Sequence, residues 1–426
     1  MSDAATPPRA AQHPEASARF PWVGMIALAA AAFLAVTSET LPTGLLPEMG
    51  AGLGVTTPEA GVLVSIYAFT VVIAATPLTA LTRRVPRRPL VVIVIVVIGL
   101  SALLLALAPN YGVAVVARIT GGMAHGVFWA VTGAYAGHIV PPHQLARAVS
   151  ITSSGVSLAL ILGAPLATIL GHALGWRAAF IVVACLLVVG AVVVGTMLPN
   201  VPRDGSGTPV TGSVPTFGRG GPGRKRDASI RPVILVCVLT GLITLGSFTL
   251  NAYIAPFVTD AMGLGAGAVG PMLFVGGLMG AVAVALVGTV LGRRSAITIA
   301  LALVLTTVGV ALLGGFASVL PVAIAAFALW ALAFGFLPPL LQTQLLRLAS
   351  ARFRDTASAL YTTAFNVGIG GGAILGAAVY AVWGIGALPW AAVSILVLAI
   401  GMLAVTARTT LSEGPLPQQV TPAPVE

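Results

Sequence analysis

The chain has 426 residues, of which 58% are hydrophobic and only 8% are charged, and its formal net charge is +10. A water-soluble protein of this length needs more polar surface than this composition supplies, so the chain belongs in a lipid bilayer. The basic excess does not indicate nucleic-acid binding, because nearly all basic residues fall in the tails and in alternate loops between apolar segments.

Twelve apolar segments are long enough to cross a bilayer as helices. The first is too long for the apolar region of a signal peptide, so we expect no cleaved signal. The sequence therefore predicts an all-α membrane protein with twelve transmembrane helices. The predicted segments are 22–46, 58–82, 89–108, 112–138, 145–171, 178–198, 232–257, 266–291, 295–315, 319–346, 355–381 and 387–407.

The first segment contains a carboxylate, Glu39. A carboxylate at the centre of a membrane helix costs about 2.5 to 3.5 kcal/mol, so its presence suggests proton or ion handling. The rise per residue places Glu39 about 10 Å from the outer end of the predicted segment. Pro42 could free backbone carbonyls beside it and let the helix bend, whereas Pro47 is expected to end the segment at the interface.

Basic loops alternate with basic-poor loops along the chain, and the loop after the second segment is the first basic one. The basic-poor loops hold only one arginine, Arg177, beside acidic residues. This asymmetry predicts cytoplasmic termini and a multi-pass protein of the inner or plasma membrane. The first basic loop contains Arg83, Arg84, Arg87 and Arg88.

The fourth segment carries Arg118 about 9 Å below the same surface as Glu39. We therefore predict a protonation-sensitive pair of these opposite charges; a static ion pair, or a Glu39 that faces water, is the alternative. His125 shares the helical face of Arg118 and could relay protons, contact substrate or hydrogen-bond another helix. Gly122 and Gly126 would let a neighbouring helix approach closely.

The fifth segment contains Gly163 and Pro165, and the run Gly368–Gly372 stands at the matching place in the second half. These residues allow close helix packing and could also permit rocking, although packing alone would explain them. His172 lies at the end of the segment and is expected at the membrane interface.

An internal repeat relates the two halves of the chain, since one constant offset matches Gly61 with Gly270 and Arg84 with Arg293. Two parallel sets of six spans are typical of transporters whose site lies between the halves. We predict two pseudo-symmetric six-helix bundles joined by a flexible cytoplasmic linker, whose basic end could alternatively contact anionic lipid. The predicted units are a cytoplasmic tail (1–21), a bundle (22–198), the linker (199–231), a second bundle (232–407) and a second cytoplasmic tail (408–426).

The second half lacks the charges of the first, because Phe248 and Phe327 match Glu39 and Arg118 in the repeat. The remaining aromatic and amide side chains would make a cavity that suits a moderately apolar solute. The residues expected around it are Tyr67, Trp129, Asn251, Tyr253, Phe334, Gln342, Gln344, Tyr361, Thr362, Thr363 and Asn366.

Three stretches, Glu39–Pro47, Ala60–Arg88 and Leu162–Arg177, resemble the major facilitator superfamily. Within it, the chain resembles the twelve-span drug:proton antiporter group, and especially its arabinose/sugar efflux and chloramphenicol-resistance branch. The resemblance covers roughly residues 22–407 and implies the major facilitator fold, a small-molecule substrate and proton coupling.

The resemblance also implies roles for single residues. Arg118, Gly122 and Gly126 are similar to the fourth-span Arg-Gly-Gly pattern of the antiporters, in which the arginine is implicated in proton transfer. The arginines after the second segment would gate the cytoplasmic side, although topology alone would also explain them. That loop departs from the usual pattern, because Thr79 and Arg83 stand where a glycine and an acidic residue are usual.

The leading hypothesis is a proton-coupled efflux antiporter for a small, moderately apolar solute, such as a drug, an antibiotic or a sugar-like compound, acting by alternating access. The alternative is a proton-linked importer or an uncoupled facilitator. The sequence has no nucleotide-binding Gly-x-x-x-x-Gly-Lys-Ser/Thr motif, which argues against direct ATP drive. It also has no metal-ligand spacing. We therefore expect a transporter rather than an enzyme, with no cofactor and no metal. We further expect a monomer whose partners are protons and lipid.

Overall fold

A computed structural model describes residues 20–140, 144–198, 229–288, 295–350 and 353–410 of the chain. Within these ranges every regular element is a helix, and twelve helical segments are long and apolar enough to cross a membrane. The predicted fold class and its twelve spans are thereby confirmed. The predicted linker lies almost entirely outside the described residues, as do most of both predicted tails.

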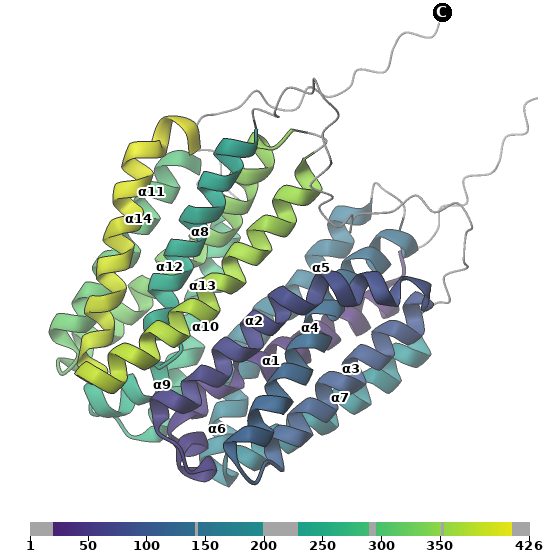
Figure 1. Ribbon diagram of the computed structural model, residues 1–426, viewed down its shortest axis with the longest axis horizontal. Helices are drawn as coiled ribbons and strands as arrows, with labels where there is room; N and C mark the ends of the chain where they lie inside the picture. Colours follow the sequence, from purple (N-terminus) through teal and green to yellow (C-terminus); the bar gives the residue numbers. More distant parts are fainter. Residues whose placement is uncertain (1–19, 141–143, 199–228, 289–294, 351–352, 411–426) are drawn as a thin grey trace, which may run out of the picture.

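The helices form two groups, coloured purple to blue and teal to yellow in Figure 1. The first group contains α1 (Trp22–Leu53), α2 (Thr57–Leu81), α3 (Arg87–Ala106), α4 (Tyr111–Ile139), α5 (Leu145–Leu158), a π-helical stretch (Ala159–Gly163), α6 (Ala164–Leu174) and α7 (Trp176–Met197). The second contains α8 (Ile230–Asn251), α9 (Ile254–Pro256), α10 (Val269–Val287), α11 (Ser295–Phe316), α12 (Leu320–Leu348), α13 (Arg354–Trp383) and α14 (Leu388–Thr410).

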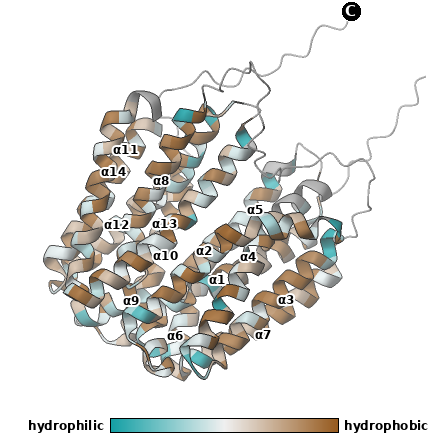
Figure 2. Cartoon of the chain, in the orientation of Figure 1, coloured by the Kyte–Doolittle hydropathy of each residue, from teal (hydrophilic) through white to brown (hydrophobic). Residues whose placement is uncertain are grey.

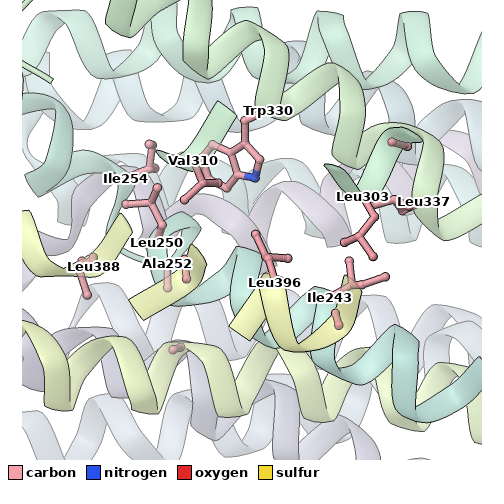
Figure 3. Packing of buried hydrophobic residues seen from close by; sticks show 14 of the residues in the cluster. Ile243, Leu250, Ala252, Ile254, Leu303, Val310, Trp330, Leu337, Leu388 and Leu396 are labelled. Carbon is pink, nitrogen blue, oxygen red and sulfur yellow. The ribbon is translucent and has the colours of Figure 1, made fainter. Parts of the chain in front are cut away.

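Each group encloses its own apolar core. In the first, buried side chains between Met25 and Leu198 pack together. In the second, Trp330 of α12 lies with Val310 of α11 and Leu250 of α8 in one cluster, as Figure 3 shows. Apolar residues predominate along the helices (Figure 2). Because lipid is as apolar as these side chains, close packing and polar contacts hold such helices together rather than removal from water.

The first helix is longer than predicted, since α1 passes through Pro42 and Pro47 and ends at Leu53. A proline inside a helix lacks an amide hydrogen and collides with the carbonyl four residues earlier. The backbone of Leu45 absorbs this conflict by leaving helical geometry (φ −132°, ψ 17°), so the helix bends and continues. Gly54, with a φ of 69°, then ends it in the left-handed conformation. Pro47 therefore does not terminate the segment as expected.

Glycines related by the repeat occupy matching places in the two groups. Gly126 of α4 lies against Ala75 of α2, and its counterpart Gly335 of α12 lies against Ala283 of α10. Likewise, Gly163 lies against α1, and its counterpart Gly372 in α13 lies against α8. The repeated glycines are thus positions of close approach between equivalent helices.

Gly155 marks a particularly close approach of α5 to α1. A methyl group at this position would meet the backbone carbonyl group of Ala29, which cannot rotate away. We expect Gly155→Ala to destabilise the folded protein by about 1 to 3 kcal/mol and to lower its apparent melting temperature in detergent.

Gly401→Ala is the matched control, because no atom lies within 4 Å of the methyl group that it would add to α14. It should leave stability unchanged, or raise it by up to about 1 kcal/mol through helix propensity. Equal melting temperatures for the two variants would contradict the close approach at Gly155.

Candidate functional site

A cluster of polar side chains lies inside the first helical group. Glu39 comes from α1, Tyr67 from α2, and Arg118, His125 and Trp129 from α4. Arg118 and His125 are only 3% and 2% exposed. Buried ionisable groups in a membrane helix are costly and usually mark an ion or proton pathway, so this cluster is the candidate functional site.

The Glu39 carboxylate contacts His125, whereas Arg118 contacts the backbone carbonyl of Glu39, and the predicted protonation-sensitive pair of Glu39 and Arg118 stays a prediction. Glu39 Oε2 lies 3.2 Å from His125 Nε2. The sequence placed Glu39 too near the end of its helix, because the predicted segment ended before Leu53. Along the observed helices, Glu39 is about 21 Å from the Leu53 end of α1, and His125 is about 21 Å from the Tyr111 end of α4. The carboxylate and the imidazole are therefore level, whereas Arg118 lies about two turns nearer that end.

Arg118 connects three helices through other contacts. Its Nε donates a hydrogen bond to the backbone carbonyl of Leu63 at 3.2 Å, and its Nη2 donates to the carbonyl of Glu39 at 3.4 Å. Its guanidinium carbon lies 4.0 Å from the ring centroid of Tyr67, in cation–π geometry. The positive charge is thus held beside the carboxylate by backbone groups, and it acts on Glu39 through space.

Trp129 makes a second contact with the imidazole of His125. Its indole Nε1 lies 2.7 Å from His125 Nε2, the same nitrogen that Glu39 approaches. The Tyr67 ring meets the imidazole edge-on, with the centroids 5.5 Å apart. Two buried atoms of the cluster, His125 Nδ1 and the Tyr67 hydroxyl oxygen, have no hydrogen-bond partner in the structure. The cluster is therefore polar, but not all of its buried polar atoms have hydrogen-bond partners among the described residues.

The residues predicted around a cavity separate into exposed and buried sets. Trp129 is 37% exposed and Gln342 is also exposed, as are Thr362 and Thr363. Asn251, Phe334 and Asn366 are half-buried. In contrast, Tyr67, Tyr253, Gln344 and Tyr361 are buried, so in this conformation they do not line an open surface as expected.

Specific contacts account for the buried tyrosines. Tyr67 lies beneath Arg118, and the Tyr361 hydroxyl donates a hydrogen bond to the backbone carbonyl of Pro338 at 2.7 Å. Tyr253 lies where the two helical groups meet. Its hydroxyl is 2.8 Å from the carbonyl of Ala373 in α13 and 3.4 Å from that of Pro58, in the first turn of α2.

The contact between the two groups is tight around Tyr253. Gly61 of α2 lies directly against the Tyr253 ring, and Gly376 of α13 also packs on it. Gly270 of α10 lies against Ile169 of α6 on a second pair of helices. In Figure 1 the groups converge towards α9 and α6. The described conformation is therefore closed at the end where α1 finishes and α2 begins.

The arginines of the first basic loop that the structure describes differ in their burial and contacts. Nε of Arg88 donates a hydrogen bond to the carbonyl of Gly195 at 3.0 Å, which joins the start of α3 to α7 inside one helical group. Arg84 is exposed and Arg87 is half-buried, while the Arg83 side chain lies outside the described residues. The gating role of these arginines stays a prediction.

A second imidazole–carboxylate pair was not predicted from the sequence. His172 Nδ1 of α6 lies 2.9 Å from Glu48 Oε1 of α1, and the histidine side chain is 11% exposed. His172 was expected at the interface and Glu48 in a loop. Because α1 continues beyond Pro47, Glu48 lies within reach of His172 in α6. A prediction that extended the first helix past Pro47 would have indicated this pair. Within the described residues, no group of three or more His, Cys, Asp or Glu side chains could hold a metal ion.

The fold is similar to that of several solved transporters. A bacterial homologue of the human lysosomal transporter Spinster, in an inward-facing and occupied conformation, gives a TM-score of 0.73 at 16% identity, covering 92% of this chain and 98% of that one. A D-xylose-proton symporter gives 0.74 at 15% identity, with the same coverage of both chains. The human organic anion transporter MFSD10 (TETRAN) gives 0.63 at 18% identity, covering 90% and 98%.

At these identities the likeness shows the fold alone. Residues 28–370, well over half of the chain, match the sequence profile of the Major Facilitator Superfamily. The fold and this match indicate a multi-pass membrane transporter rather than an enzyme. The chain belongs to the Major Facilitator Superfamily.

Proposed function

We propose that the protein is a proton-coupled efflux antiporter for a small, moderately apolar solute, of the drug:proton antiporter group, and that it works by alternating access. The observation that carries the proposal is the contact of the half-buried Glu39 with the buried His125, with the buried Arg118 bonded to the Glu39 backbone. A carboxylate and an imidazole are the two side chains best suited to take up and release protons near neutral pH.

In the proposed cycle, Glu39 and His125 bind the proton together. Arg118 disfavours a second positive charge nearby, so the pair holds its proton only while the local environment favours it. One proton that crosses 100 mV contributes about 2.3 kcal/mol, enough to sustain a solute gradient on the order of fiftyfold. The solute would bind between the helical groups, against exposed or half-buried residues such as Trp129, Gln342 and Asn366.

We further propose a monomer in the inner or plasma membrane with both termini in the cytoplasm. The alternation of basic and basic-poor loops supports this orientation. The described conformation, closed at the end where α1 finishes, would then be open towards the cytoplasm. A proton-linked importer or an uncoupled facilitator is the competing function, because the same fold occurs in a D-xylose-proton symporter.

Accumulation assays in a pump-deficient host test this function. We expect expression of the wild-type protein to lower the cellular accumulation of at least one compound in a panel of chloramphenicol, dyes, sugars and nucleosides. A protonophore that collapses the proton gradient should abolish the effect. Efflux that persists without the gradient would indicate a facilitator, and proton-driven uptake would indicate an importer. No change with any compound would contradict efflux.

A further inference from the structure

We propose that Trp129 is a positioning residue that couples protonation to the solute-facing surface. Its indole N–H and the Glu39 carboxylate compete for the same nitrogen, Nε2 of His125. The inference rests on the proposed function in one respect, because it takes the pair of Glu39 and His125 as the proton site.

The competition follows from the chemistry of the two contacts. An indole nitrogen only donates, so Trp129 can bond to Nε2 at 2.7 Å only while Nε2 carries a lone pair. An ionised carboxylate only accepts, so Glu39 can bond to Nε2 at 3.2 Å only while Nε2 carries a proton. While Glu39 is ionised, no single protonation state of His125 satisfies both contacts. A proton on Nε2 therefore exchanges the Trp129 hydrogen bond for the Glu39 ion pair.

The surroundings of His125 leave neither state fully satisfied. With a lone pair on Nε2, the proton of neutral His125 sits on Nδ1, which is buried without a partner. With a proton on Nε2, the indole N–H of Trp129 loses its acceptor. Each state thus makes one of the two contacts to Nε2, loses the other and leaves Nδ1 without a partner, so the protonation of Nε2 decides which contact forms.

Other ionisable groups near His125 come from α1, α2 and α4 itself. They are Glu39, Tyr67 and Arg118, and the guanidinium is held over the Tyr67 ring. Neither α3 nor α5 contains a carboxylate. Of their arginines that the structure places in contacts, Arg88 bonds to the carbonyl of Gly195 and Arg147 lies over the Trp22 ring. Glu39 is therefore the anionic partner available to a protonated His125 within these helices.

The state of Trp129 determines how well an apolar solute can cover its ring. Trp129 is 37% exposed, whereas His125 is buried. While His125 Nε2 accepts the indole N–H, the Trp129 ring is held in place and its only polar atom has a hydrogen-bond partner. Once Nε2 is protonated, an apolar solute on the ring would bury an unpaired donor, which weakens binding. A proton and an apolar solute then exclude each other, as antiport requires.

The tryptophan fluorescence of the full-length protein in lipid nanodiscs tests the switch, with the proton alone as the ligand. The difference between wild-type and Trp129→Phe emission isolates Trp129. We expect this difference to change in one transition as the pH is lowered. His125→Gln should remove the transition, because a glutamine keeps a hydrogen-bond acceptor but does not titrate. Trp383→Phe, which deletes a 70% exposed tryptophan of α13, should leave the transition intact.

Glu39→Gln gives a second, quantitative readout. Loss of the carboxylate should displace the midpoint of the transition measurably, because a proton on Nε2 loses its ionic partner. This variant keeps the inference testable even if His125→Gln does not fold. A wild-type difference signal that is constant with pH, a transition that persists in His125→Gln, or an unshifted midpoint in Glu39→Gln would each overturn the switch.

The fluorescence measurement involves no transported solute, so its failure is distinguishable from failure of the proposed function. Proton-coupled efflux without a Trp129 transition would overturn the switch alone. A clear transition in a protein whose efflux ignores the proton gradient would overturn the proposed function and leave the switch standing.

Discussion

Glu39→Gln is expected to abolish proton-driven transport in a protein that still folds. Glutamine has nearly the same shape as glutamate and can still hydrogen-bond to His125, but it cannot bind or release a proton. The proton gradient would then do no work at this site, and the solute gradient that the protein sustains should fall by a factor on the order of fifty, to the level of uncoupled diffusion. The measurement is efflux from proteoliposomes under an imposed pH gradient.

Glu59→Gln is the matched control for this prediction. Glu59 is exposed at the start of α2, where its carboxylate accepts hydrogen bonds from the backbone N–H and the hydroxyl of Thr56 in a capping box. Glutamine serves the same capping role, so transport should be unchanged. If Glu39→Gln kept the full dependence on the pH gradient, Glu39 would not be the coupling residue.

Gly61→Val is expected to shift the conformational equilibrium away from the state described here. Any side chain at Gly61 would collide with the ring of Tyr253, which is fully buried and hydrogen-bonded to Ala373. The collision is relieved only if the two helical groups move apart at this end. An overpacking cost of about 1 to 3 kcal/mol corresponds to a shift of roughly 5- to 150-fold in the ratio of closed to open states.

Distances between spin labels would measure this shift. Ala51 at the end of α1 and Ala266 near the start of α10 are both exposed and belong to different groups, so labels there report opening. The distance distribution should lengthen in Gly61→Val and return towards wild type in Gly61→Val combined with Tyr253→Ala. Lengthening that persists in the double variant would show that the Tyr253 ring is not the obstacle.

Hydropathy and segment length were sufficient to predict the twelve spans, because the bilayer imposes a minimum length on every crossing helix. The end of α1 could not be predicted in the same way. The two prolines suggested a stop, but a single residue, Leu45, takes up the distortion and the helix continues. That error placed Glu39 level with Arg118, whereas the observed helices bring its carboxylate level with His125.

The burial of Tyr67, Tyr253 and Tyr361 was equally hidden from the sequence. A helix that is apolar on all sides gives no periodic signal to indicate which face meets protein and which meets lipid or a cavity. The orientation of each tyrosine depends on contacts between distant segments, such as Tyr253 with Gly61. The sequence did, however, place Glu39, Arg118 and His125 among the ionisable groups of one buried cluster, because each is an expensive residue at membrane depth.

The bend at Leu45 divides α1 into two arms, and each arm is tethered to a different helix. Glu39 ties the arm before the bend to α4 through His125, and Glu48 ties the arm after it to α6 through His172. Since Pro47 has no amide hydrogen, no backbone hydrogen bond from that residue can straighten the joint. A change of angle at Leu45 must therefore stretch or release one of the two imidazole contacts. The shape of α1 is in this way linked to two imidazole–carboxylate contacts, one on each side of a single bend.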